Sequence, residues 1–115
     1  MNGLHILARV RLSSDFEARE PGFYLERAKH IITQADLTIV GEVLVEFGNN
    51  AFTLAVMLAE SHMTMHTWYE KGYVDLDIYG CGVTKDSSQS VREAFDGIVA
   101  LFEPIWIEDR HDIKR

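Results

Sequence analysis

Apolar and polar residues alternate along several stretches of the chain, a pattern typical of β-strands that bury one face. Residues 52–59 form the most apolar run, as expected of a central strand, and Gly48-Asn49-Asn50 is a turn signal in front of it. The segment 69–72 joins two alternating stretches into a predicted hairpin. The strands predicted in this way cover residues 4–12, 38–47, 52–59, 63–68, 73–79 and 105–108.

Two other stretches repeat their apolar residues with the period of a helix. The first covers residues 23–34, and its predicted apolar face consists of Phe23, Ala28, Ile31 and Ile32. The second covers residues 90–102, where Pro104 ends it, and its predicted apolar face consists of Val91, Phe95, Ile98, Val99 and Phe102.

The order of elements is therefore β, α, three or four β, α, β. Two helices on one face of an antiparallel sheet predict a two-layer α+β fold. The other face of the sheet would be bare in a monomer, so we expect two such sheets to pack face to face in a homodimer, as an αββα sandwich.

Composition narrows the class of protein. The 115 residues suit a single domain over 1–115, and 47% apolar residues suit an ordinary globular protein. A net charge of −7 argues against a nucleic-acid partner, and no apolar run reaches the length that a membrane span needs. The N-terminus lacks the pattern of a signal peptide, and a single cysteine suits the reducing cytoplasm. We therefore expect a cytoplasmic protein without a membrane partner.

Candidate chemistry begins where the apolar run 52–59 ends, at Glu60-Ser61. Ser61 offers a hydroxyl for chemistry or merely a cap for the strand end. His62 and His66 share one strand face, where either can be a general acid or base or a half-buried structural residue. They could also bind zinc or copper, but convincing further ligands are missing, so no metal is predicted. Cys81 is either a small buried residue or a thiol that donates protons.

The longest motif spans residues 59–82, and it resembles the prokaryotic S-adenosylmethionine decarboxylases in residue type and spacing without a gap. The first part is Ala59-Glu60-Ser61-His62-Met63-Thr64-Met65-His66-Thr67-Trp68-Tyr69-Glu70-Lys71-Gly72-Tyr73, and the second is Asp77-Ile78-Tyr79-Gly80-Cys81-Gly82. The resemblance extends more weakly over nearly the whole chain. It implies the same four-layer dimer that the element order suggests.

The resemblance also implies that the chain cuts itself between Glu60 and Ser61. The products would be a β chain of residues 1–60 and an α chain of 61–115, with a pyruvoyl group made from Ser61 as its only cofactor. His66 would assist processing and remain in the active site, and Thr53 would replace a serine that assists processing. A small-molecule amino acid would bind the pyruvoyl ketone as a Schiff base and lose carbon dioxide, and Cys81 would return a proton to it.

Two further matches concern the substrate. Phe47 stands where the family has a phenylalanine that stacks on adenine, and Glu70 where it has a glutamate that bonds the ribose hydroxyls. Asp75 departs from the family, which has a small apolar residue there, and an added carboxylate could hold a basic side chain. We therefore expect S-adenosylmethionine as substrate, feeding polyamine synthesis. Arginine or ornithine is the first alternative, and an unprocessed non-catalytic paralogue is the second.

Overall fold

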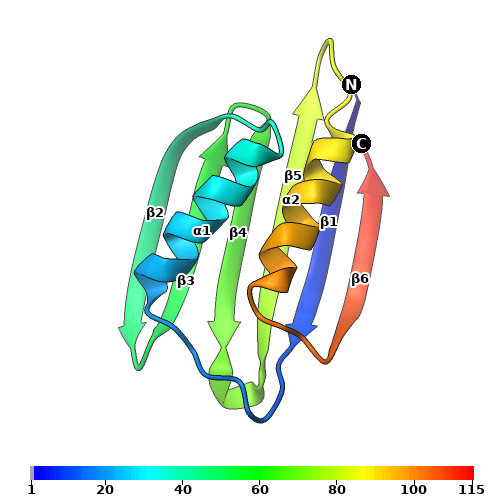
Figure 1. Cartoon of the computed structure of the whole chain (residues 1–115). Helices are drawn as coiled ribbons and strands as arrows, with labels where there is room; N and C mark the ends of the chain where they lie inside the picture. Colours follow the sequence, from blue (N-terminus) through cyan, green and yellow to red (C-terminus); the bar gives the residue numbers. More distant parts are fainter. Residues whose placement is uncertain (1) are drawn as a thin grey trace.

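The computed structural model describes residues 2–115 and contains one six-stranded antiparallel sheet with both helices on the same face (Figure 1). The strands lie in the order β2-β3-β4-β5-β1-β6. The two-layer α+β arrangement predicted from the sequence is confirmed. The elements are β1 (Asn2–Arg11), α1 (Pro21–Gln34), β2 (Ile39–Gly48), β3 (Ala51–Leu58), β4 (Ser61–Trp68), the 3-10 turn η1 (Tyr69–Lys71), β5 (Tyr73–Gly82), α2 (Ser88–Ala100) and β6 (Trp106–Lys114).

The core lies between the helices and the sheet and includes Tyr24 of α1. The Tyr24 ring stacks on Phe52 of β3 and on Phe102 after α2, with centroid distances of 5.4 and 4.8 Å. All three side chains are at most 1% exposed, and full burial of a large apolar side chain contributes about 1.5–3 kcal/mol. This contact joins both helices to the sheet and keeps its strands in fixed positions.

The predicted apolar face of the first helix was partly wrong. The residues that α1 buries are Pro21, Tyr24, Ala28 and Ile32. Phe23 and Ile31 are only half-buried. The helix begins two residues earlier than predicted because Pro21 lies in its first turn, where its fixed φ suits a helix and its missing N–H costs nothing.

Several strand boundaries also differ from the prediction, and β5 ends at Gly82 instead of Tyr79. β4 begins at Ser61 instead of Met63, so only Ala59 and Glu60 form the turn between β3 and β4. β6 continues to Lys114 instead of ending at Glu108. As an edge strand it pairs only with β1, and its side chains are mostly exposed, so apolar alternation could not reveal its length.

The face of the sheet without helices is less apolar than we expected. Its β2 edge is apolar, with Val43, Val45 and Phe47 exposed by 51%, 44% and 59%. Its centre carries histidine, aspartate and arginine side chains from β4, β5 and β1. None of the helices within residues 2–115 is long and apolar enough to cross a membrane.

Candidate active site

The turn between β3 and β4 contains the predicted cleavage site and is held from both sides. The backbone N–H of Cys81 donates to the carbonyl oxygen of Glu60 at 2.9 Å. The Glu60 carboxylate accepts from the backbone N–H and the hydroxyl of Thr38, at 3.0 and 3.1 Å. The Thr38 carbonyl in turn accepts from the N–H of Ala59 at 2.8 Å. These contacts fix the peptide bond that joins Glu60 to Ser61.

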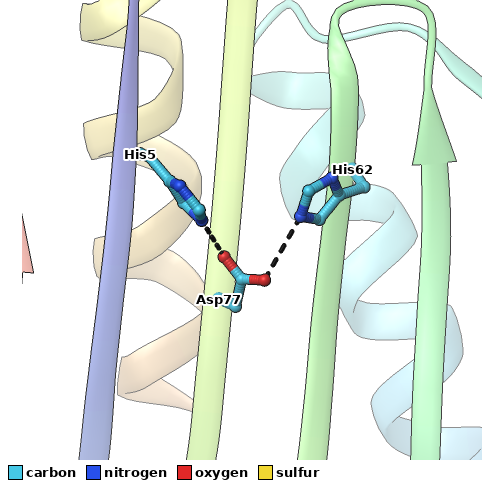
Figure 2. A group of neighbouring side chains, drawn as sticks. All are labelled: His5, His62 and Asp77. Carbon is cyan, nitrogen blue, oxygen red and sulfur yellow. Dashed lines mark hydrogen bonds and ion pairs between the residues drawn. The ribbon is translucent and has the colours of Figure 1, made fainter. Parts of the chain in front are cut away.

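Ser61 begins a chain of polar contacts that crosses three strands. Its Oγ lies 3.0 Å from Nδ1 of His62, and Nε2 of His62 lies 3.2 Å from Oδ2 of Asp77. The other Asp77 oxygen is hydrogen-bonded to Nε2 of His5, so the two rings lie on either side of one carboxylate (Figure 2). The Thr64 hydroxyl also approaches Asp77, at 3.4 Å. Every polar atom of the Asp77 side chain therefore has a partner.

The register of the sheet brings these groups together. β5 lies between β4 and β1, and Tyr79 of β5 is directly opposite His62 on one side and His5 on the other. Asp77, two residues from Tyr79 on the same face, is the diagonal neighbour of both histidines. The His5 ring stacks on Tyr79 with a centroid distance of 5.0 Å, which fixes its orientation.

The same three residues are the group within residues 2–115 that could also hold a metal ion, since their donor atoms lie within 4.8 Å of one another. In the structure, both ring Nε2 atoms instead face the Asp77 carboxylate in hydrogen bonds. The pair considered from the sequence, His62 and His66, lies about 13 Å apart along β4, which is too far for one ion.

Cys81 lies at the end of β5, beside the Glu60 carbonyl that its own N–H contacts. Its side chain is half-buried. A hydrogen bond between the side chains of Tyr79 and Cys81 is the main cause that raises the pKa of the Tyr79 phenol. The preceding Gly80 lets α2 pack closely here, since a Cβ at that position would lie 2.7 Å from Cγ2 of Val91. The backbone of Cys81 is thereby held next to the predicted cleavage site.

A second cluster lies farther along β4, and it contains other residues predicted from the sequence. The Thr53 hydroxyl is hydrogen-bonded to Nδ1 of His66. The His66 ring lies between Trp68 and Phe47, at centroid distances of 4.5 and 5.9 Å. Phe47 is more exposed than a core phenylalanine would be, at 59%. The structure therefore brings Thr53, His66 and Phe47 together on the helix-free face.

A cavity of about 420 Å³ opens beside this cluster, and Asp75 lines it together with Arg9. Arg9 donates to the Asp75 carboxylate from Nε at 2.9 Å and from a terminal nitrogen at 3.3 Å. The hydrogen bond to Asp75 raises the pKa of the Arg9 guanidinium. The same guanidinium lies over the Tyr73 ring, 3.8 Å from its centroid. The Asp75 charge is therefore already paired within the chain.

The two clusters lie at a distance from each other. Ser61 and His66 are five residues apart on an extended strand, which corresponds to about 16 Å. Glu70 is exposed in η1, beyond the far end of β4. One chain therefore does not place the predicted nucleophile and thiol beside the predicted histidine and substrate-binding residues.

Sequence reasoning missed the roles of His5, Thr38 and Arg9. Their partners lie 72, 22 and 66 positions away in the sequence. Local periodicity cannot reveal such contacts, and only the pairing of β1 with β5 could have pointed to the first and third. Asp77 was part of the quoted motif, but no role was predicted for it.

Comparison with known proteins shows the family to which the chain belongs. Residues 18–112 match the family model of S-adenosylmethionine decarboxylase. An S-adenosylmethionine decarboxylase proenzyme of Archaeoglobus fulgidus is 40% identical over 103 residues, covering 89% of this chain and 88% of the relative. The proenzyme of Picrophilus torridus is 37% identical over 113 residues, covering 94% and 80%.

A solved structure gives the same result for the fold. The crystal structure of the adenosylmethionine decarboxylase from Aquifex aeolicus superimposes with a TM-score of 0.82 at 30% sequence identity, covering 99% of this chain and 90% of that one. Since the family model spans most of the sequence and both relatives are covered over 80% or more of their length, the chain belongs to the S-adenosylmethionine decarboxylase family of carboxy-lyases.

Proposed function

We propose that the protein is an S-adenosylmethionine decarboxylase that makes its own pyruvoyl group by cutting itself between Glu60 and Ser61. One observation carries the proposal. The Glu60 carbonyl oxygen accepts from the Cys81 N–H at 2.9 Å, while the next residue supplies a hydroxyl. A fixed donor on a carbonyl oxygen stabilises the negative charge that develops there when a nucleophile attacks its carbon.

The cleavage follows from these groups. The Ser61 hydroxyl oxygen bonds to the Glu60 carbonyl carbon, the oxyanion accepts from Cys81 N–H, and the C–N bond breaks to leave an ester and a free amine. Loss of the Ser61 α-proton then releases the Glu60 carboxylate and leaves a dehydroalanine. Water converts this residue into a ketone and releases ammonia. β3 and β4 remain paired by their backbone hydrogen bonds after the cut.

The residues around the turn suit the group that this reaction would leave. A pyruvoyl group supplies an electron sink for decarboxylation, the role that pyridoxal has in other enzymes. Cys81 lies beside it, because its N–H contacts the carbonyl of the residue in front of Ser61. Its thiol donates the proton that the substrate α-carbon requires once carbon dioxide has left.

A homodimer would complete the site. Ser61 and Cys81 lie near one end of β4, whereas His66 and Phe47 lie toward the other, so one protomer cannot bring them together. A two-fold axis through the helix-free face would set the first pair of one protomer opposite the second pair of its partner. Glu70 follows the end of β4 that is nearer to His66, and it would bind substrate from there. The exposed apolar β2 edge, which includes Phe47, supports burial of this face.

S-adenosylmethionine suits the pocket better than arginine or ornithine does. The relatives from Archaeoglobus fulgidus and Picrophilus torridus are named for it. The residue that could have held a basic side chain, Asp75, is ion-paired with Arg9. An arginine or ornithine side chain that bound Asp75 would have to displace this guanidinium.

The test combines mass measurement with an assay of released carbon dioxide. Intact mass under denaturing conditions should show two fragments, 1–60 and 61–115, and the protein should decarboxylate S-adenosylmethionine but neither arginine nor ornithine. Ser61→Ala is the matched control, and it should remain uncut and inactive. An uncut wild-type chain would instead support a non-catalytic paralogue, and turnover of a basic amino acid alone would support the changed substrate.

A further inference from the structure

We propose that His62 is the general base that activates Ser61 for self-cleavage, and that Asp77 and His5 position it. This inference rests on the proposed self-processing function and assigns residues to its first step. It is carried by the continuous contacts from Ser61 Oγ to His62, from His62 to Asp77 and from Asp77 to His5. Figure 2 shows the contacts of Asp77 with the two histidines.

The contact between Arg115 and His5 determines which ring nitrogen of His5 carries the hydrogen. A terminal nitrogen of Arg115 lies 3.0 Å from Nδ1 of His5, and a guanidinium can only donate. Nδ1 of His5 is therefore the acceptor, and Nε2 carries the hydrogen and donates to Asp77. Two backbone hydrogen bonds between Arg115 and Gly3, at 3.1 and 3.3 Å, hold this arginine beside β1.

The same reasoning applies to His62. Its Nε2 faces the Asp77 carboxylate, which can only accept, so this nitrogen carries a hydrogen. In the neutral ring the lone pair then lies on Nδ1, which is 3.0 Å from Ser61 Oγ. Ser61 is thus the nucleophile, His62 the base and Asp77 the carboxylate that orients the base. This is the arrangement that activates serine nucleophiles in other enzymes.

The proton balance closes without another reactant. As Ser61 Oγ bonds to the Glu60 carbonyl carbon, its proton moves to Nδ1 of His62, and Asp77 stabilises the resulting imidazolium. As the C–N bond breaks, Nδ1 returns this proton to the nitrogen of Ser61. His62 ends neutral, and the ester and the amine are both formed.

Two other assignments fit these contacts less well. A metal held by His5 and His62 would need lone pairs on both Nε2 atoms, which would place an N–H of His5 against the Arg115 guanidinium. His66 of the same protomer lies about 16 Å from Ser61. Its Nδ1 is already hydrogen-bonded to Thr53. His62 is the imidazole that contacts the nucleophile.

The first experiment follows cleavage from the moment of synthesis, in chains made by cell-free translation. His62→Ala and the closer mimic His62→Gln should both slow the appearance of fragments by roughly 10²- to 10⁴-fold, the usual contribution of a general base. Added imidazole should restore part of the rate in His62→Ala. Circular dichroism of each variant beside Ser61→Ala, which cannot cleave, shows whether the fold is retained.

Hydroxylamine at neutral pH then identifies the step, because under these conditions it cuts esters much faster than peptide bonds. The His62 variants should resist it, since little of their ester forms. A His62 variant that hydroxylamine cuts readily would place His62 after ester formation and overturn the proposal, as would cleavage of both variants within twofold of the wild-type rate. If the wild-type chain itself stays uncut, the proposed function fails instead.

A double-mutant cycle tests the positioning residues. Asp77→Asn should slow cleavage by about 100-fold, the effect of a small misplacement of a catalytic group. The same change in a His62→Ala background should have little further effect, because Asp77 acts through His62. His5→Gln, which keeps an N–H donor, should cleave faster than His5→Ala. Additive effects of Asp77 and His62, or loss of wild-type cleavage with EDTA, would overturn this arrangement.

Discussion

Two inactive variants of this chain should restore each other's activity when they share a dimer. Cys81→Ala removes the thiol of β5 that lies near the start of β4, and His66→Ala removes the imidazole toward the other end of β4. If each active site takes Cys81 from one protomer and His66 from its partner, a mixed dimer contains one site with both mutations and one with neither. The unmutated site should process and turn over normally.

The structure sets the expected size of this effect. Ser61 and His66 are about 16 Å apart in one chain, so no side-chain motion brings them into contact within a protomer. Random pairing of equal amounts makes half of the dimers mixed, each with one working site of two, so the unfractionated mixture should reach about a quarter of wild-type activity and the purified mixed dimer about half. Co-expression with two affinity tags allows the mixed dimer to be purified, and decarboxylation of S-adenosylmethionine is then measured.

The matched control pairs two variants from the same end of the strand. A mixed dimer of Ser61→Ala and Cys81→Ala carries a defect in both sites and should remain inactive. Recovery in this control, or no recovery in the first pair despite a purified mixed dimer, would refute the idea that the two clusters meet across the interface. Activity in a monomer at micromolar concentration by light scattering would do the same.

Three further changes act on single contacts. Cys81→Ala should still yield the two fragments but lose most turnover, and an uncut chain would show that the thiol is needed for processing. Phe47→Ala should raise KM by about 5- to 150-fold, since stacking on a base contributes about 1–3 kcal/mol, and an unchanged KM would leave Phe47 only an interface role. Thr38→Val removes one hydrogen bond to Glu60 and should slow cleavage by up to about 10-fold, measured by fragment mass, with unchanged cleavage arguing against a role in holding the turn.

Much of the fold could be predicted because its signals are local. Alternation identified the strands, and helix periodicity with Pro104 identified α2 to within two residues at either end. The apolar pattern predicted less where a segment buries few of its side chains. The edge strand β6 exposes most of its side chains, so its length was missed. The face that α1 buries includes Tyr24, which was not predicted there, and the hydroxyl of this buried tyrosine accepts from the Arg19 N–H at 3.2 Å.

For the candidate site, too, the residues within one motif could be predicted, whereas contacts between segments distant in the sequence could not. Ser61, His66 and Cys81 could be selected because they lie in one continuous motif. The contact of Asp77 with His5 depends on the pairing of β1 with β5, and the pairing of Asp75 with Arg9 depends on the same register. One residue of slip between these strands would move both arginine and histidine to the helix side of the sheet. A motif therefore selected the candidate reacting groups, while only the register showed which side chains contact them.

This register also explains how a polar sheet face can be buried in a dimer. An unpaired charge removed from water costs several kcal/mol, whereas a charge that already has its hydrogen-bond partners costs much less to cover. Arg9 is paired with Asp75, and Asp77 with two histidines and Thr64, before any second chain arrives. The apolar β2 edge can then supply the attraction between protomers. The contacts of Asp77 that would orient His62 for cleavage would thereby also let the helix-free face close against a partner.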